Sequence, residues 1–164
     1  MKKYWAEFLG TYILVFVGAG AIVINSVTDG VVSHLGIGLT FGLVVMAMIY
    51  AIGDISGAHI NPAVTIAFWV AKRFPANQLF QYISFQLLGA ISASATLYFL
   101  FPDALTMGQT LPLNGNWLQS FVLELILTFI LMFVILNVST GAKAKGITAA
   151  LAIGGVVAFE ATFA

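Results

Sequence analysis

Cysteine is absent from the 164 residues, and charged residues make up only 7% of them. Without cysteine, the chain can form no disulfide bond, no thiolate metal site and no cysteine nucleophile. Soluble domains carry roughly 25% charged residues, so this chain lacks the polar surface that keeps a protein in water. The net charge is zero, with no basic stripe for nucleic acid. The two histidines lie far apart in the sequence and give no basis for a metal site.

Apolar residues dominate instead. They make up 61% of the chain, and the mean hydropathy is +1.06. A helix that crosses a bilayer needs about 20 mostly apolar residues. Five such runs occur, at residues 5–24, 35–55, 79–101, 117–137 and 146–164. The composition therefore predicts an all-α, integral, multi-pass membrane protein.

The N-terminal run has features of a secretory signal peptide. Lys2 and Lys3 precede an apolar stretch, and small residues follow at positions 19–21. However, Glu7 lies inside the apolar run, and a similar segment recurs later in the chain. We expect this segment to be kept as the first membrane helix.

A broken apolar segment separates the second run from the third. It contains Asn61, Pro62 and Ala63, and the apolar stretch after them is too short to span a membrane. Proline suits the first position of a helix, where its missing N–H costs nothing. We predict a half-length helix at residues 62–71, entered through a loop at 56–60. Such a loop at membrane depth is tolerated only where protein or a water-filled cavity surrounds it.

The basic residues indicate the orientation of the chain. They fall at the N-terminus, after the half-helix, and between the fourth and fifth runs. These six residues are Lys2, Lys3, Lys72, Arg73, Lys143 and Lys145. The connections at 25–34 and 102–116 contain no lysine or arginine. Positive charge favours the cytoplasmic side, so the N-terminus is predicted to be cytoplasmic and the half-helix to enter from there.

Two internal similarities predict a repeat. Residues 7–16 align with residues 124–133 at an offset of 117, with Glu, Thr, Ile, Leu and Phe in common, and residues 39–45 align with 151–157 at an offset of 112. The first copy starts inside and the second outside, which is typical of inverted repeats with a site near the midplane. A complete second copy would place another such asparagine at about position 173. The second half-helix and a sixth span are therefore expected to be missing from these residues.

Three motifs resemble the major intrinsic protein family of aquaporins and glycerol channels. They are Ala-Glu-Phe-Leu-Gly-Thr at 6–11, Ser-Gly-Ala-His-Ile-Asn-Pro-Ala-Val-Thr at 56–65, and Gln-Leu-Leu-Gly-Ala at 86–90. The resemblance implies an aquaporin-like inverted-repeat bundle, present as five spanning helices and one re-entrant half-helix. It also implies a homotetramer with one pore in each protomer. The first repeat would cover 1–101, an extracellular connecting loop 102–116, and the incomplete second repeat 117–164.

The loop itself supports a pore. Asn61 stands where a helix cap would accept a backbone N–H through its side-chain oxygen, which turns the amide N–H₂ donors toward the lumen. The helix dipole adds roughly half a positive elementary charge at that point, which opposes protons and cations. Carbonyl oxygens of the preceding residues can replace lost hydration. These are Gly57, Ala58, His59 and Ile60.

Further residues are assigned supporting or selecting roles. Glu7 and Glu124 are ionisable side chains inside a span, where burial of their charge is unfavourable. We expect them to accept hydrogen bonds from backbone N–H groups of the non-helical loops, as the resemblance also implies. As an alternative, Glu7 lies close enough to the membrane surface for its carboxylate to reach water. Gln86 is expected to be an interior hydrogen-bonding group. By the resemblance, Phe41 and Ala161 contribute to a selectivity constriction, and the small Ala161 suggests a wider opening.

The predicted function is passive conduction of water or small neutral solutes such as glycerol, without ions, protons or any cofactor. The expected location is a prokaryotic plasma or inner membrane. One alternative is a non-conducting membrane fragment with a structural or assembly role. Another is an intramembrane serine protease, for which Ser56 and His59 are the candidate pair. For His59, a carbonyl contribution, a pH-sensitive gate and a simple filling of the vestibule all remain open.

Overall fold

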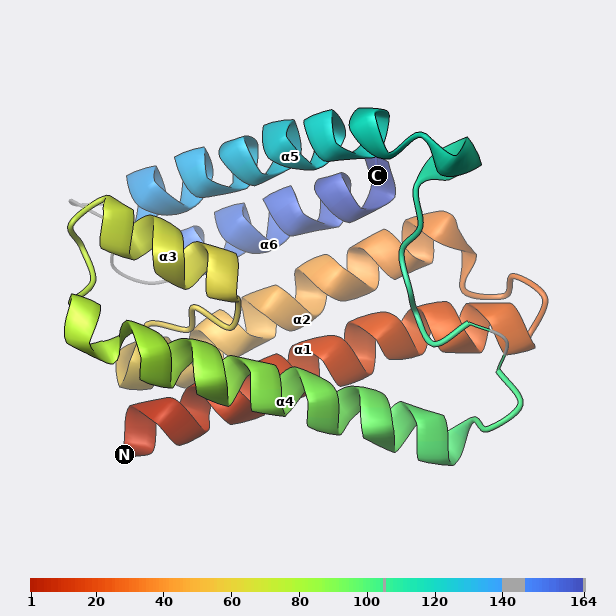
Figure 1. Cartoon of the computed structure of the whole chain (residues 1–164), viewed down its shortest axis with the longest axis horizontal. Coiled ribbons are helices and arrows are strands. Elements are labelled where there is room, and N and C mark those ends of the chain that lie inside the picture. The colour runs from red at the N-terminus through yellow and green to blue at the C-terminus, as the bar shows by residue number, and fades with distance from the viewer. Residues whose placement is uncertain (105, 140–146, 164) are drawn as a thin grey trace.

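The computed structural model describes residues 1–104, 106–139 and 147–163, and these contain helices and loops but no strand (Figure 1). The α-helices are α1 Lys2–Val27, α2 Ser33–Ser56, α3 Pro62–Val70, α4 Leu79–Leu100, α5 Trp117–Val138 and α6 Ile147–Phe163. Two short 3₁₀ helices, η1 Ala76–Gln78 and η2 Leu113–Gly115, lie in the connections. The predicted half-helix is present as α3, one residue shorter than expected.

Four helices are long and apolar enough to cross a membrane: α1, α2, α4 together with η1, and α5. The fifth predicted span appears as α6, an apolar helix of 17 residues. Its predicted first and last residues, 146 and 164, lie outside the described residues. The chain thus folds as the predicted all-α membrane bundle with one half-length helix.

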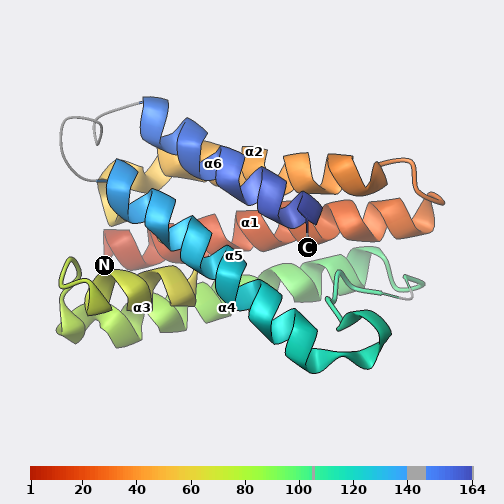
Figure 2. The ribbon, with the colours of Figure 1, turned by 90° about the horizontal axis from the view of Figure 1, so that it is seen from above.

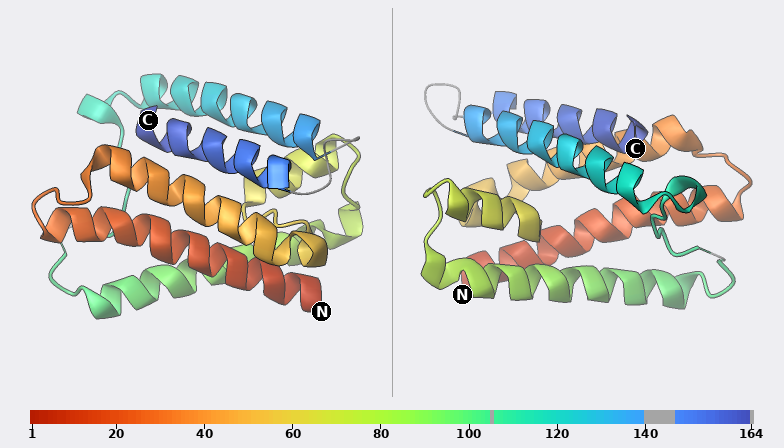
Figure 3. Two further views of the ribbon diagram at one scale, coloured as in Figure 1. Left: turned by 180° about the vertical axis from the view of Figure 1, so that it is seen from behind. Right: turned by 45° about the horizontal axis from the view of Figure 1, so that its top comes forward.

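The long helices lie side by side in the order α5, α6, α2, α1 and α4 (Figures 1 and 3). Figure 2 shows α5 running obliquely to α1 and α4. The half-helix α3 lies beside the first turns of α4, at the end of the bundle that holds the N-terminus, and its own first turn points toward the middle of the molecule. This arrangement places the start of α3 inside the bundle and not at its surface.

Glycines allow the closest helix contacts. A side chain at Gly42 would lie 2.4 Å from the carbonyl oxygen of Gly154, and one at Gly154 would lie 2.7 Å from that of Gly42. Gly38 faces α6 in the same way, against Thr162. The spacing of four residues between Gly38 and Gly42 therefore provides a close approach of α2 to α6. The two glycines that the repeat alignment pairs, Gly42 and Gly154, touch each other.

The described basic residues gather at one end of the bundle. Lys2 and Lys3 begin α1, while Lys72 and Arg73 follow α3, at the end where the N-terminus lies. The guanidinium of Arg73 donates a hydrogen bond to the carbonyl of Leu136 near the end of α5 (2.6 Å). Lys143 and Lys145 lie outside the described residues. Which side of a membrane this end faces remains a prediction.

Candidate functional site

The half-helix begins with the predicted asparagine cap. Asn61 has extended backbone angles (φ −154°, ψ 128°), and its Oδ1 accepts a hydrogen bond from the N–H of Ala63 (2.7 Å). Pro62 occupies the first helical position, where no N–H is needed. Because the cap holds Oδ1, the Nδ2 donors on the other branch of the amide point away from the helix backbone.

A single carboxylate holds the loop before the half-helix. Glu7 of α1 is completely buried. Its Oε1 accepts hydrogen bonds from the hydroxyl of Ser56 (2.6 Å) and the N–H of His59 (3.0 Å). Its Oε2 accepts from the N–H of Ile60 and from Nε2 of Gln86, both at 2.7 Å. Four donors thus compensate the burial of one carboxylate, which would otherwise be strongly unfavourable. These are the contacts that the predicted supporting role of Glu7 requires.

The loop backbone is strained around this carboxylate. Gly57, Ala58 and Ile60 have φ values of 88°, 49° and 42°. A left-handed conformation is uncommon for alanine and an outlier for a β-branched residue such as isoleucine. It persists because successive N–H groups converge on Glu7, as in an anion-binding nest. In a trans peptide the C=O points opposite to the N–H, so the carbonyls of Ala58 and His59 point away from Glu7.

A second layer of polar contacts involves Thr65, which the sequence analysis did not single out. Thr65 is fully buried on the first turn of α3. Its hydroxyl donates to the carbonyl of Asn61 (3.0 Å), accepts from Nε2 of Gln86 (2.9 Å), and lies 3.1 Å from Nδ1 of His59. The spacing of four residues, which puts Thr65 on the same helix face as Asn61, is the signal that could have identified it. The layer connects α3 and α4 to Glu7.

The imidazole of His59 lies among aromatic rings. Its ring centroid lies 4.7 Å from that of Phe68, 4.9 Å from that of Phe74 and 5.3 Å from that of Tyr82. The Tyr82 hydroxyl donates to the carbonyl of Ser56 (2.8 Å), which joins α4 to the end of α2. The Ser56 hydroxyl bonds to Glu7 and Nδ1 of His59 lies against Thr65. No Ser–His hydrogen bond therefore exists in the described part of the chain, and the protease alternative lacks its nucleophile pair.

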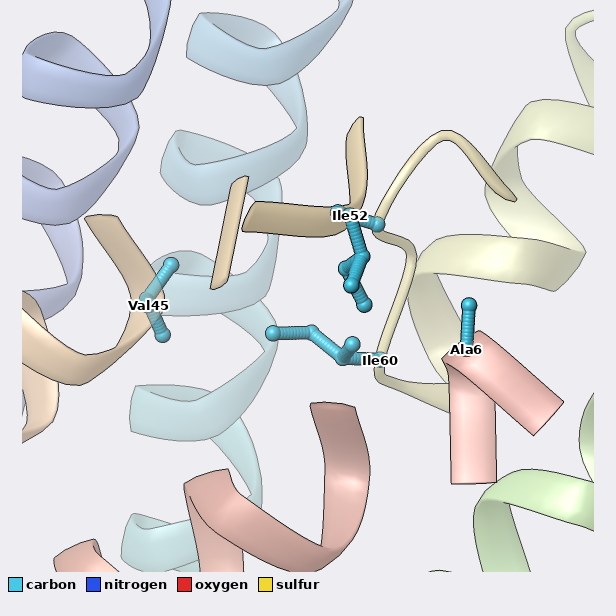
Figure 4. Close-up of a cluster of buried hydrophobic side chains, with 5 residues drawn as sticks. Ala6, Val45, Ile52 and Ile60 are labelled. Carbon is cyan, nitrogen blue, oxygen red and sulfur yellow. The ribbon is translucent and has the colours of Figure 1, made fainter. Parts of the chain in front are cut away.

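Apolar packing fixes the same loop from the other side. The side chains of Ile52 and Ile60 lie close to each other in a buried cluster that includes Ala6 and Val45 (Figure 4). A Cβ on Gly10 would come within 2.5 Å of Ile52 and 2.6 Å of Ile60. Gly10 therefore leaves the space that these two side chains fill. The loop is held by hydrogen bonds on one face and by packing on the other.

A cavity of about 960 Å³ runs between the two halves of the bundle. It brings together residues of the loop, the cap, the constriction and α5 that the sequence singled out. These are Phe41, Gly57, Ala58, His59, Ile60, Asn61, Glu124 and Ala161. Pro62, Ala63, Glu7 and Gln86 are not among its lining residues. Phe41 packs against Gly18, where any side chain would clash with its ring.

The connection between α4 and α5 also reaches this cavity. From the sequence, residues 102–116 are expected to form an extracellular connecting loop. In the structure, Gly108 and Thr110 line the cavity. Gly108 has a φ of 75°, and a Cβ there would lie 2.8 Å from that of Ala19 on α1. This part of the loop thus packs against the second half of α1 and reaches the cavity.

The second repeat contributes two carboxylates. Glu124 is exposed to the cavity and has no hydrogen-bond partner in the described part of the chain, so its expected loop contact is not formed among these residues. Glu160 of α6 also lines the cavity, but it is buried, and the sequence analysis did not identify it. An acidic residue in the last turn of an apolar helix was the available signal.

Comparison with known proteins explains this architecture. The model of the family described as "Major intrinsic protein" matches residues 1–164. The chain belongs to the major intrinsic protein family. This is a family of membrane channels, which agrees with the polar re-entrant loop beside a cavity and with the apolar spans. The resemblance drawn from the three motifs is thereby confirmed.

Individual relatives support the same assignment. The chain is 47% identical over 158 residues to "Aquaporin NIP1-1" of Zea mays, covering 96% of this chain and 56% of the relative. It is 46% identical over 160 residues to "Nodulin-26" of Glycine max, covering 94% of this chain and 57% of the relative. The chain therefore spans little more than half the length of these relatives. Both are from plants, and they give the expected prokaryotic membrane no support.

A solved structure confirms the fold. The X-ray structure of the aquaglyceroporin from Plasmodium falciparum superposes with a TM-score of 0.79 at 31% sequence identity. The match covers 99% of this chain and 70% of that one. The helical arrangement, including the half-helix, is therefore that of a membrane channel.

Proposed function

We propose that this chain forms a passive channel for water and small neutral solutes such as glycerol, and that it excludes ions and protons. The observation that carries the proposal is the lining of the cavity. The strained loop from Gly57 to Ile60 and the capped Asn61 face a space that is otherwise mostly apolar. Polar groups in a narrow apolar passage replace the hydration that a small solute loses on entry.

The loop supplies acceptors in the proposed pathway. Because the N–H groups of His59 and Ile60 are bound to Glu7, the carbonyls of Ala58 and His59 point away from that carboxylate. A water or a hydroxyl that moves past them can donate a hydrogen bond at each step. Since the buried carboxylate fixes the backbone, these acceptors need no rearrangement when the solute arrives.

Asn61 supplies the donor. Its Nδ2 group lies at the N-terminus of α3, where the helix dipole places partial positive charge. A passing water oxygen accepts from this amide and cannot then relay a proton along a chain of waters. The same positive field raises the energy of a cation at this depth. Water and neutral solutes would therefore pass, while protons and cations would not.

The basic residues support an orientation of the chain in the membrane, and the family resemblance supports an oligomeric state. The end of the bundle with Lys2, Lys3, Lys72 and Arg73 would lie in the cytoplasm, so that α3 enters from that side. The resemblance to the family implies a homotetramer in the bilayer with one pathway in each protomer. Phe41 of α2 and Ala161 of α6, which both line the cavity, would set the width of the constriction, and Glu124 would support a second non-helical segment.

A stopped-flow swelling assay on proteoliposomes tests the proposal. The chain should raise water permeability above that of empty vesicles, and Asn61→Asp should lower it by about fivefold, the rate equivalent of one hydrogen bond of about 1 kcal/mol, while admitting protons. Asn116→Asp is a matched control, because Asn116 also caps a helix through its side chain but does not line the cavity. Equal effects of both variants would refute the role of Asn61. Background permeability of the unmodified chain would favour the non-conducting alternative.

A further inference from the structure

Glu160 is a buried ionisable residue without a role in the pathway described above. Only 9% of it is exposed, and it lines the cavity from α6, next to Ala161. Its Oε1 has no hydrogen-bond partner in the described part of the chain. A buried carboxyl group with one unpartnered oxygen on an apolar helix of a membrane protein is costly and is a candidate functional group.

The surroundings of Glu160 offer it few donors. The other ionisable side chains on the outer part of the cavity are Glu124 from α5 and His34 from the start of α2. Glu124 adds a second acceptor, and Nε2 of His34 is bonded to the carbonyl of Thr162 (2.6 Å). None of the described lining residues is lysine or arginine. Glu160 therefore has a hydrogen bond with the backbone of Leu131 on α5 but no basic side chain beside it, so a solute in the cavity can supply a further donor.

The positions of Glu160 and Asn61 complement each other. Glu160 offers an acceptor from the last turn of α6, and Asn61 offers amide donors from the start of α3. Phe41 lines the same cavity with an apolar ring. A hydroxyl or an amide group both donates and accepts, so a small solute with several such groups can use the two residues in turn.

Resting on the proposed channel function, we propose that Glu160 is a specificity-determining residue that accepts hydrogen bonds from the solute. It favours small neutral solutes with two or more O–H or N–H donors, such as polyols and urea, over solutes of similar size that only accept hydrogen bonds. The carboxylate replaces water that a donor-rich solute loses on entry. A solute without donors gains nothing from it.

Permeability ratios test this selection. We would measure the permeability of proteoliposomes to glycerol, urea, dimethyl sulfoxide and water for the unmodified chain, Glu160→Leu and Glu160→Gln. Glu160→Leu should lower glycerol and urea permeability by about tenfold relative to dimethyl sulfoxide, the equivalent of one net hydrogen bond. Glu160→Gln, which keeps an acceptor oxygen, should lower it less. Phe159→Leu is the control, because Phe159 is the neighbouring residue and does not line this cavity.

An unchanged ratio of glycerol or urea permeability to dimethyl sulfoxide permeability in Glu160→Leu would overturn the proposal. An equal fall in all four permeabilities, together with a lower thermal unfolding temperature, would also overturn it, because Glu160 would then have a structural role. A second measurement does not need conduction. A hydrophobic carbodiimide labels buried carboxyls, and the labelled residue is identified by mass spectrometry. Urea should slow the labelling of Glu160, and dimethyl sulfoxide should not. Equal protection by both solutes would contradict the proposal even if water permeability remained at background.

Discussion

Glu7 and Glu124 occupy equivalent places in the two repeats, yet their surroundings differ completely. Glu7 is fully buried and accepts four hydrogen bonds. Glu124 is exposed to the cavity and accepts none from the described part of the chain. The difference lies in the donors and not in the helices, since α2, the loop and α4 supply every partner of Glu7. A carboxylate in a membrane helix thus stabilises the fold only where a non-helical segment offers it N–H groups.

The two halves are alike where they meet. Gly42 of α2 and Gly154 of α6 face each other with the same kind of backbone contact in both directions. This contact joins the second span of the first repeat, α2, to the corresponding span of the second repeat, α6. The close crossing of α2 and α6 is thus a feature to which both repeats contribute. The closed polar network around Glu7 belongs to the first repeat, because it depends on the re-entrant segment.

The largest expected difference is between the substitutions of the two glutamates, Glu7→Ala and Glu124→Ala. Glu7→Ala leaves the N–H groups of His59 and Ile60 buried without an acceptor, so we expect it to lower the free energy of unfolding by at least about 3 kcal/mol. Glu124→Ala removes no hydrogen bond and should change it by less than about 1 kcal/mol. Unfolding in mixed detergent micelles, followed by far-ultraviolet circular dichroism, measures both.

Glu7→Gln sharpens this test. The amide keeps one acceptor oxygen of similar shape, so a milder loss than for alanine would attribute the effect to hydrogen bonding and not to packing. If Glu124→Ala were as damaging as Glu7→Ala, the contrast between the repeats would be wrong.

Most of the fold follows from the sequence. The runs of apolar residues predict the long helices, because only helices satisfy their own backbone groups in lipid. Pro62 after Asn61 predicts the start of α3, since the cap and the missing N–H both favour it. The lone charge of Glu7 in an apolar run predicts a polar partner nearby. Each of these inferences rests on a local rule that applies in any tertiary context.

What the sequence could not provide is the convergence of side chains from separate helices. Thr65 and Gln86 are 21 residues apart and meet only after α3 has folded back against α4. Glu160 shows no repeat partner in the alignment, and its significance depends on its burial and on the cavity beside it. The approach of Gly108 and Thr110 to that cavity is likewise a tertiary feature, because loop sequences carry little information on direction.

Glycine substitutions test the symmetric contact. Gly42→Ala and Gly154→Ala each place a Cβ within 2.7 Å of a carbonyl oxygen of the facing helix, so each should lower the free energy of unfolding by about 1–3 kcal/mol. Gly155→Ala is the control on the same helix, since no atom lies within 4 Å of its added Cβ. It should be neutral or slightly stabilising, because alanine favours a helix. A marked difference between Gly42→Ala and Gly154→Ala would show that the halves do not contribute equally at their crossing.

The smallest expected effect tests the polar network with a single hydroxyl in each repeat. Thr65→Val keeps the shape of the side chain but removes the acceptor for Gln86 and the donor to the carbonyl of Asn61, so it should cost about 1–2 kcal/mol. Thr128, the residue that aligns with Thr11, is exposed beside the cavity and makes no hydrogen bond among the described residues, and Thr128→Val should be neutral. Denaturation of the two variants in parallel measures the difference. A neutral Thr65→Val would mean that Glu7 alone stabilises the loop. The hydroxyl of Thr65 would then orient the side chains of Gln86 and His59 without adding to the free energy of unfolding.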